Sequence, residues 1–264
     1  MRFIRTVAEV REALQGQDGR IGLVPTMGAF HEGHLALMRE ARGGCDLVVV
    51  SLFVNPSQFN APADLVRYPR DEASDARAAQ GVGVDLLFAP SAEELYPDGF
   101  DTWVEPGELA GVLEGASRPG HFRAVATVCT KLFSIVHPDL AYFGRKDAQQ
   151  VAVIKRVVTD LNLPVEVVVL PTVRDGDGLA LSSRNVFLSP AERAVALCLP
   201  RALDAGLAAH RSGEDPVAAA GSVLQAEQAL VVDYVAVADF DGQTLAAAVR
   251  VGATRLIDNV LLSR

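Results

Sequence analysis

Short apolar runs alternate with segments of helical spacing through the first two thirds of the chain. We predict strands at five of these runs, residues 21–25, 47–54, 85–89, 140–143 and 165–170. The second run, LVVVSLFV, is β-branched and almost uninterrupted, which is typical of a strand covered on both faces in a parallel sheet. Because repeated strand–helix–strand units form right-handed crossovers, the pattern predicts an α/β fold with a doubly wound parallel sheet.

The segments between these runs have the spacing of amphipathic helices. One helix is predicted after the first strand, and a second over residues 64–80, broken near Pro69. Two more are predicted at residues 124–136 and 147–161, after a Gly- and Pro-rich stretch with one short strand expected at residues 102–104. Doubly wound sheets bind ligands at the carboxyl ends of their strands, so we expect the loops at those ends to share one rim.

The last third of the chain has a different pattern of apolar and polar residues. Ser189 followed by a proline predicts a helix start, and two Ala-rich helices come next. Strand-like stretches follow at residues 231–240 and 254–262. We therefore expect two domains, residues 1–172 with the parallel sheet and residues 173–264 as a smaller α+β domain.

Composition narrows the class of ligand. The 264 residues include 24 Lys and Arg against 33 Asp and Glu, a formal net charge of −9. Nucleic-acid binding depends mainly on neutralising phosphates, so this balance argues against a nucleic-acid partner. Basic residues gathered in one pocket would still suit a small anion.

Cysteine usage and the apolar runs indicate the compartment. Cys45, Cys129 and Cys198 lie far apart with no CxxC pair, which favours reduced thiols over a disulfide scaffold. The first residues interleave charged and apolar side chains, unlike a signal peptide. Every apolar run is far shorter than the roughly 20 residues of a membrane-spanning helix. We expect a cytoplasmic protein with no membrane partner.

The first candidate site is the segment PTMGAFHEGH, where a predicted strand gives way to a helix. A helix N-terminus offers unpaired N–H groups to a phosphate, and His31 and His34, three positions apart, point the same way on a first helical turn. The alternatives are a plain turn with two surface histidines, or a zinc site whose third ligand has no convincing spacing. The order strand, PTMG, HEGH, helix resembles the HxGH signature of the nucleotidyltransferase superfamily, which transfers or forms adenylates.

Four further segments carry polar side chains at or near predicted strand ends. Asn55 and Gln58 supply amides for hydroxyls and carboxylates, and Lys146 in FGRKDAQQ starts a helix with a cation. Arg118 lies in EGASRPGHFR, and LSSRN combines two hydroxyls with a guanidinium in a loop suited to close over a polyphosphate. Each segment alone is typical of a turn, a helix cap or an exposed loop. Together they would gather several cations at one rim, which matches a triphosphate nucleotide.

The full set of motifs resembles the pantothenate synthetase family, also called the pantoate–β-alanine ligase family. The matching segments, in the same order, are PTMGAFHEGH, VSLFVNPSQF, RYPRD, EGASRPGHFRAV, FGRKDAQQ, GLALSSRN and TRLIDN. The resemblance implies ATP-dependent condensation of pantoate with β-alanine to give pantothenate, AMP and pyrophosphate through a pantoyl adenylate. It also implies a Rossmann-like N-terminal domain, a smaller C-terminal lid domain and a homodimer.

The resemblance assigns roles to matching positions. Catalysis would fall to His34 as proton donor, with His31 and Lys146. ATP would be bound by Met27, Gly28, Ala29, Phe30, His31, Glu32, Gly33, His34, Gly144, Arg145, Lys146, Asp147, Val173, Leu181, Ser182, Ser183 and Arg184. Pantoate and β-alanine would be bound by Gln58, Gln150, Asn55 and Arg118.

Magnesium is also implied by the resemblance, but its protein ligands are not. Some relatives carry acidic residues after the YPR segment, whereas Ser74, Asp75 and Ala78 here retain one carboxylate. We expect the ion to be held mainly by ATP phosphates and water.

Two other functions remain open from the residues. An adenylyl transferase would leave AMP on a phosphorylated acceptor and form a stable dinucleotide-like product. A non-catalytic nucleotide-binding regulator would not turn over ATP. The products formed from ATP discriminate both from a ligase.

Overall fold

Two compact units make up the chain in the computed structural model, which describes residues 1–60 and 62–263. The first unit consists of Met1–Gly144 and Ala152–Leu170. The second consists of Arg145–Val151 and the chain from Pro171 onward. The segment that carries Lys146 therefore belongs by its contacts to the second unit, although it follows a strand of the first.

The first unit is built on a six-stranded sheet with the order β1-β4-β3-β2-β5-β6, in which every neighbouring pair is parallel. In that order the strands span Arg2–Ile4, Leu86–Phe88, Leu47–Leu52, Ile21–Thr26, Leu140–Gly144 and Glu166–Leu170. The chain runs outward in one direction from β2 and in the other from β5, so the order reverses between these strands. This confirms the predicted doubly wound sheet, and places the carboxyl ends of β2, β3 and β5 on one edge.

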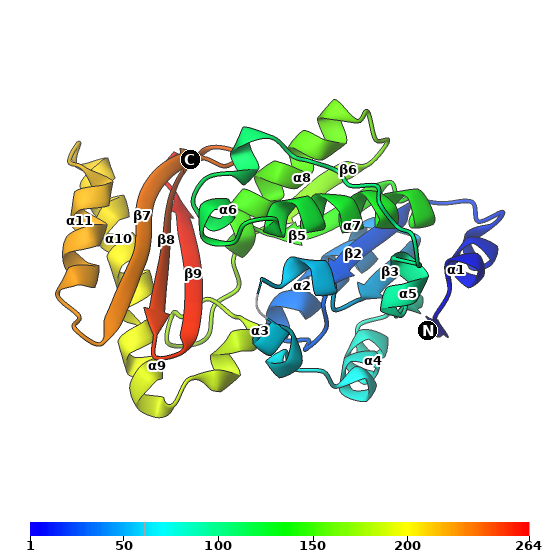
Figure 1. Cartoon of the computed structure of the whole chain (residues 1–264), viewed down its shortest axis with the longest axis horizontal. Helices are drawn as coiled ribbons and strands as arrows, with labels where there is room; N and C mark the ends of the chain where they lie inside the picture. Colours follow the sequence, from blue (N-terminus) through cyan, green and yellow to red (C-terminus); the bar gives the residue numbers. More distant parts are fainter. Residues whose placement is uncertain (61, 264) are drawn as a thin grey trace. The chain divides into compact units, whose positions relative to one another are not determined.

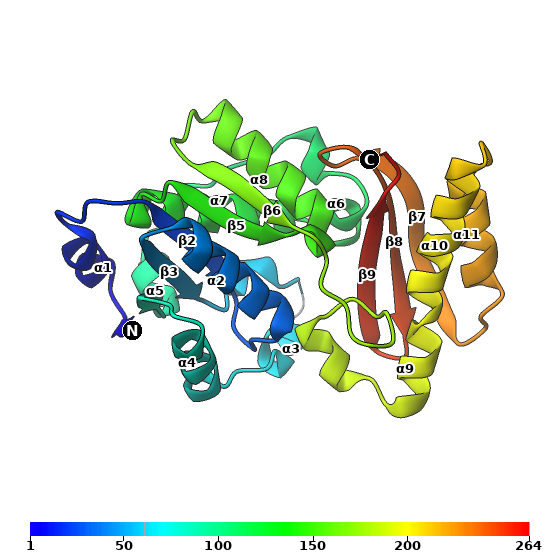
Figure 2. The same cartoon turned by 180° about the vertical axis from the view of Figure 1, so that it is seen from behind.

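Helices cover both faces of this sheet. Figures 1 and 2 show α2 and α7 on opposite sides of it. Side chains of a strand alternate between faces, so Val24 and Val50 pack with Met38 of α2 in one apolar cluster. The helices of this part of the chain are α1 (Val7–Leu14), α2 (Glu32–Gly44), α3 (Pro62–Arg67), α4 (Glu72–Gly81), α5 (Ala92–Leu95), α6 (Glu114–Ser117), α7 (His121–Val136) and α8 (Ala148–Asp160), with 3₁₀ turns η1 (Pro56–Gln58), η2 (Glu108–Ala110) and η3 (Arg145–Asp147).

Two local predictions for this region had different outcomes. The predicted break near Pro69 is confirmed, because α3 ends at Arg67 and α4 begins at Glu72. The strand expected at residues 102–104 is wrong. Instead of pairing with a strand, Val104 donates its N–H to the hydroxyl of Thr127 on α7, 3.0 Å away. A helix side chain thus satisfies this backbone where a sheet partner was expected.

The second unit carries a three-stranded antiparallel sheet, β7-β8-β9, over Leu230–Asp239, Gln243–Val251 and Thr254–Leu261. Its helical elements are η4 (Ser183–Phe187), α9 (Pro190–Ala196), α10 (Cys198–Arg211) and α11 (Pro216–Gln225). Ser189 caps α9 in a capping box with Glu192, which confirms the predicted start. Leu199, Leu203 and Leu224 pack with Leu245 of β8 to form the core of this unit.

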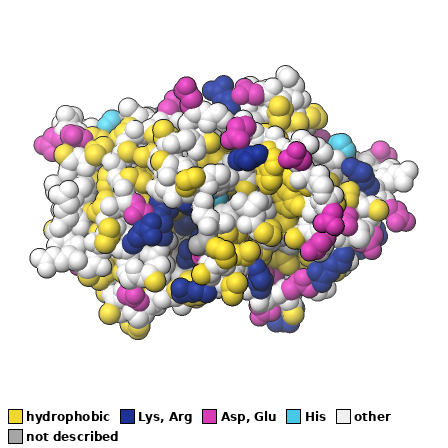
Figure 3. Space-filling view, viewed as in Figure 1, with side chains coloured by type: hydrophobic (Ala, Val, Ile, Leu, Met, Phe, Trp, Pro, Cys, Tyr) yellow, Lys and Arg dark blue, Asp and Glu magenta, His cyan; other side chains and the backbone are white. Residues whose placement is uncertain are grey.

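Charged side chains of both signs are interspersed on the face shown in Figure 3. Cys45, Cys129 and Cys198 are buried and unbridged, as predicted, and burial raises the pKa of the Cys129 thiol to about 12. Within the residues that the structure describes, no helix has both the length and the apolar character to cross a bilayer.

Candidate active site

The turn between β2 and α2, residues 27–34, presents the two histidines and is called the histidine turn below. His31 is the N-cap of α2, and its Nδ1 accepts the N–H of Gly33 at 3.2 Å. His34 Nδ1 in turn accepts the N–H of His31 at 3.4 Å, and the two ring centroids lie 4.1 Å apart. Because Nδ1 of each ring is an acceptor, a neutral imidazole at either position carries its proton on Nε2. Two Nε2–H donors therefore accompany the positive end of a helix, an arrangement suited to phosphate oxygens.

Asp75 on α4 binds the backbone of the histidine turn. Its carboxylate accepts the N–H of Ala29 at 2.9 Å and that of Phe30 at 2.7 Å. Ala29 has a φ of +53°, a conformation that residues with a Cβ rarely adopt, and its N–H is satisfied only through Asp75 among the described contacts. Burial raises the pKa of Asp75 above its usual range, while the two N–H donors act in the opposite direction.

Glycine is required at position 28 of this turn. Gly28 has a φ of +84°, and a Cβ placed there would lie 2.9 Å from both Asp75 Oδ2 and Leu52 Cδ1. Its N–H donates to Thr26 Oγ1, which itself donates to Ser51 O on β3 at 2.6 Å. The turn is thus tied to the end of the neighbouring strand.

The segment after β3 presents Gln58. Asn55 is fully buried and caps η1, with its Oδ1 accepting both the N–H and the hydroxyl of Ser57. Asn55 Nδ2 donates to Gln58 Oε1 at 3.0 Å. Since the amide oxygen of Gln58 is occupied in this way, its NH₂ is the group left to donate to a carboxylate or hydroxyl.

Arg118 and His121 both contact the backbone carbonyl oxygen of Gln58. Arg118 Nη2 donates to this oxygen at 3.1 Å, and His121 Nδ1 lies 3.2 Å from it. Arg118 Nη1 is 3.1 Å from His121 Nε2, and because a guanidinium only donates, Nε2 accepts and Nδ1 carries the proton. Both ring nitrogens of His121 are engaged, so this residue does not fit the zinc alternative.

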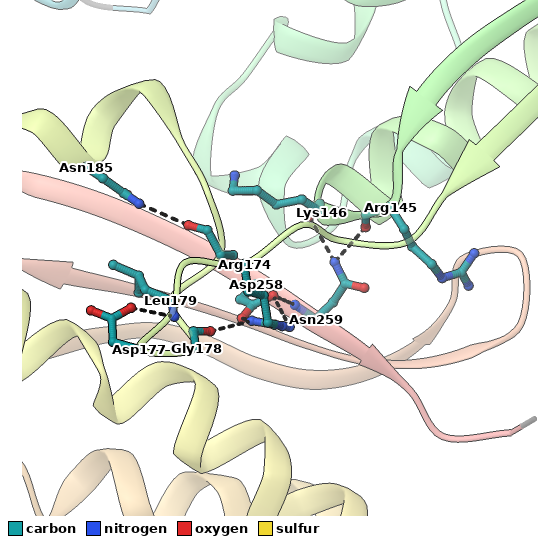
Figure 4. Close-up of polar contacts among 10 residues, drawn as sticks. Arg145, Lys146, Arg174, Asp177, Gly178, Leu179, Asn185, Asp258 and Asn259 are labelled. Carbon is teal, nitrogen blue, oxygen red and sulfur yellow. Dashed lines mark hydrogen bonds and ion pairs between the residues drawn. The ribbon is translucent and has the colours of Figure 1, made fainter. Parts of the chain in front are cut away.

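The lysine turn, residues 145–147, is organised within the second unit. The amide of Asn259 on β9 donates to the carbonyls of Arg145 and Lys146, both at 2.9 Å. Arg145 Nη2 donates to the carbonyls of Phe240 and Asp241 at 3.2 and 3.0 Å. Figure 4 shows the Lys146 side chain extending away from Asn259.

The loop from Val173 to Leu181 is a closed hairpin-like segment. Leu181 donates its N–H to Val173 O at 3.0 Å, and Arg174 and Ala180 form an antiparallel bridge. Arg193 binds the carboxylates of Asp175 and Asp177 at 2.6 and 2.8 Å. Ser182 caps η4 by accepting the N–H of Arg184.

The predicted site residues divide between the two units. Unit one holds Met27, Gly28, Ala29, Phe30, His31, Glu32, Gly33, His34, Asn55, Gln58, Arg118 and Gly144; unit two holds Arg145, Lys146, Asp147, Gln150, Val173, Leu181, Ser182, Ser183 and Arg184. Sequence reasoning gave no role to Asn259 and weighed Asp75 only for magnesium, whereas the structure places both against the backbone of predicted site residues. Each lies in a segment that carries the family resemblance or directly follows one, but polarity alone did not reveal its partner.

Among the side chains that the structure describes, no cluster suited to magnesium is found. In residues 1–60 and 62–263, no three His, Cys, Asp or Glu side chains are grouped to hold a metal ion. Asp75, the one carboxylate among positions 74, 75 and 78, is 4% exposed and bonded to two backbone N–H groups.

Comparison with known proteins gives a consistent result across the whole chain. The model of the family described as pantoate-beta-alanine ligase matches residues 2–261. The pantothenate synthetase of Roseiflexus sp. (strain RS-1) is 52% identical over 276 residues, covering 99% of each chain.

Solved structures agree with this match. The pantothenate synthetase of Thermus thermophilus superposes with a TM-score of 0.95 at 47% identity and full coverage of both chains. The pantoate-beta-alanine ligase of Francisella tularensis, solved with beta-gamma ATP and beta-alanine, gives 0.87 at 35% identity, covering 99% of this chain and 98% of that one. On these matches, the chain belongs to the pantoate-beta-alanine ligase family.

Proposed function

We propose that this protein condenses pantoate with β-alanine, consuming ATP and releasing AMP and pyrophosphate. The observation that carries the proposal is the histidine turn, with Nδ1 of both rings held by backbone N–H groups at the start of α2. Membership of the family over residues 2–261 supplies the substrates. The ligase of Francisella tularensis in complex with beta-gamma ATP and beta-alanine supports ATP and β-alanine as two of them.

The first step forms an adenylate. A carboxylate oxygen of pantoate attacks the α-phosphorus of ATP, the bond from this phosphorus to the bridging oxygen breaks, and pyrophosphate leaves. Two anions must meet, so neutralising charge is the main demand on the enzyme. We assign this task to the Nε2–H groups of His31 and His34, with His34 as proton donor, and to the ammonium of Lys146.

The second step transfers the acyl group. The uncharged amine of β-alanine attacks the activated carbonyl, AMP leaves with the bonding electrons, and the nitrogen loses its extra proton to give pantothenate. Because only the deprotonated amine is nucleophilic, we expect the rate to rise with pH through the near-neutral range. A flat pH profile would show that amine deprotonation does not govern the measured rate.

We assign the acid and amine sites to the first unit and to α8. The Gln58 NH₂, oriented by Asn55, would donate to pantoate, and Gln150 would be its second contact. We also assign Arg118 to the substrate site, because its guanidinium lies against the Gln58 carbonyl.

The remaining nucleotide contacts are assigned to Met27–Phe30, Gly144–Asp147, Val173 and Leu181–Arg184. We further propose that the Ser182–Arg184 loop covers the adenylate against water. ATP should then protect this loop from limited proteolysis, and an unchanged cleavage pattern would count against the cover.

Magnesium is proposed to arrive as part of the ATP substrate, held by phosphates and water. The engagement of Asp75 by two backbone N–H groups supports this assignment. A homodimer, a cytoplasmic location and a division of labour between residues 1–172 and the lid at 173–264 complete the proposal.

The decisive experiment measures pyrophosphate release with each substrate omitted in turn. The proposal predicts AMP and pyrophosphate in equal amounts only when ATP, pantoate and β-alanine are all present at catalytic turnover. A stable dinucleotide-like product would identify an adenylyl transferase instead. Nucleotide binding without ATP turnover would identify a regulator.

A further inference from the structure

The TRLIDN segment has no part in the chemistry above, yet it supplies two buried polar side chains. Asp258 and Asn259 lie side by side on β9 and are 2% and 6% exposed. Neighbouring residues of a strand point to opposite faces, so the two side chains serve different partners. Buried polar groups are costly without hydrogen bonds, which makes the identity of those partners informative.

Asn259 binds the backbone of the lysine turn. A carboxamide NH₂ has two donors, and both are used, one on the carbonyl of Arg145 and one on that of Lys146, each at 2.9 Å. These carbonyls belong to consecutive residues of η3, directly before α8 begins at Ala148. Figure 4 shows that the side chain of Lys146 extends away from the amide that holds its backbone.

Asp258 serves the adjoining loop. Its carboxylate binds the guanidinium of Arg174 at 2.6 and 3.1 Å and also accepts the N–H of Asn259 at 2.8 Å. Arg174 Nη1 reaches on to Gly178 O, inside the hairpin closed by Val173 and Leu181. Burial acts to lower the pKa of Arg174, but the bond and charge of Asp258 outweigh it and raise that pKa. The guanidinium therefore stays charged.

We propose that Asn259 is a positioning residue for Lys146, which fixes the lysine turn from β9 while Asp258 fixes the neighbouring nucleotide loop. This inference rests on the proposed function, in which Lys146 binds the phosphates of ATP. Asn259 thus fixes the backbone from which the ammonium of Lys146 projects. A shift of about 1 Å in such a group can cost on the order of a hundredfold in rate.

The test compares two substitutions that separate hydrogen bonding from filling of space. Asn259→Asp keeps the shape but replaces the donating NH₂ by a carboxylate oxygen, which would face the two carbonyls without a proton to donate. Asn259→Ser is smaller and keeps one donor. The readout is the single-turnover rate of pyrophosphate formation from ATP and pantoate, which isolates the first step.

We expect Asn259→Asp to lower this rate by about tenfold to a hundredfold, and Asn259→Ser by about fivefold. Far-UV circular dichroism and thermal unfolding confirm that each variant is folded. Asp233→Asn is the matched control, because Asp233 pairs with Arg250 and Arg255 in the same sheet and does not touch the lysine turn. It should match the wild-type rate even where its unfolding temperature falls.

A double-mutant cycle with Lys146→Ala measures the coupling between Asn259 and Lys146. A purely structural role of Asn259 would give no such coupling. If Asn259 acts through Lys146, adding Asn259→Ser to Lys146→Ala costs little further rate, because the positioned group is already gone. Full additivity of the two losses overturns the inference, as does a wild-type rate in Asn259→Asp. A wild-type protein without pyrophosphate formation overturns the proposed function instead, so the two failures are distinguishable.

Discussion

The histidine turn and the lysine turn carry different parts of the proposed chemistry and are held in different ways. Most contacts of the histidine turn are local, such as Gly33 to His31 and Gly28 to Thr26, each two positions apart. The lysine turn depends on residues 95 to 114 positions away, in the strands and turn of the second unit.

These contacts show two ways of holding a binding loop in place. Strand, glycine and helix cap shape the histidine turn within one motif, and Asp75 anchors it from a distant helix. The lysine turn also lies between a strand and a helix, but the side-chain contacts that the structure describes for it reach the C-terminal sheet and its β7–β8 turn. Loss of the Asn259 contact should therefore impair Lys146 while it leaves the histidines in place.

The largest expected effect tests whether both turns contribute. His34→Ala removes an Nε2–H donor and Lys146→Ala removes a cation, and each should lower kcat/KM by about a hundredfold or more. Steady-state pyrophosphate release measures both. Near-normal activity in either variant would show that the turn carrying the substituted residue takes no part in the chemistry.

A smaller loss is expected from Asp75→Ala, which probes the distant anchor of the histidine turn. The N–H groups of Ala29 and Phe30 lose their acceptor, at a cost of about 2 kcal/mol in unfolding free energy. We also expect activity to fall by about tenfold, because the turn relaxes from the positive φ at Ala29. Urea unfolding and turnover measure the two effects.

Ser74→Ala is the control for this substitution, since it changes an exposed neighbour on the same helix. Unchanged turnover in Asp75→Ala would mean that local contacts alone shape the histidine turn. The two turns would then differ in kind, one held by local contacts and the other by the C-terminal sheet.

Two glycines of the second unit test its packing without touching the lysine turn. A Cβ at Gly206 would lie 2.3 Å from Leu245 Cδ2 and 2.8 Å from Pro216 O, whereas one at Gly221 meets nothing within 4 Å. We expect Gly206→Ala to lower the unfolding free energy by about 2 kcal/mol. Gly221→Ala should raise it by up to about 1 kcal/mol, because alanine favours a helix.

Thermal unfolding with turnover at 25 °C measures both glycine variants. The folded fraction of Gly206→Ala should keep its activity, unlike the Asn259 variants. A selective loss of turnover in Gly206→Ala would show that general packing of the second unit also sets the lysine turn.

The smallest effect concerns the ion pairs across β7, β8 and β9. Burial opposes ionisation of Asp233, but Arg255 and Arg250 outweigh it and hold its pKa below the usual range. A carboxyl with a lower pKa in the folded chain stabilises above the unfolded value, near pH 4, and this contribution is lost as the pH falls through the folded pKa. Asp233→Asn should therefore lower the unfolding free energy by about 1 kcal/mol at pH 7.

The pH dependence checks that sign. Below about pH 4 the difference between wild type and Asp233→Asn should shrink, as followed by urea unfolding across pH 3–7. A difference independent of pH would assign the effect to shape, with no part for charge.

Local pattern predicted much of the fold because its signals act over a few residues. The break between α3 and α4 and the Ser189 cap of α9 follow from chemistry within one or two helical turns. Strand β8 is not predicted from the sequence. It is the central strand and almost continuously buried, so its Ala-rich run TLAAAVRV lacks the alternation of a strand with one exposed face.

The sequence by itself determined the parallel sheet, the histidine turn and the set of polar residues typical of this family. Only the tertiary structure decided which backbone groups those residues satisfy: Asp75 with Ala29 and Phe30, and Asn259 with the lysine turn. The physical reason is that apolar periodicity is encoded along the chain, whereas a buried hydrogen bond depends on which distant carbonyl or N–H folding brings within about 3 Å.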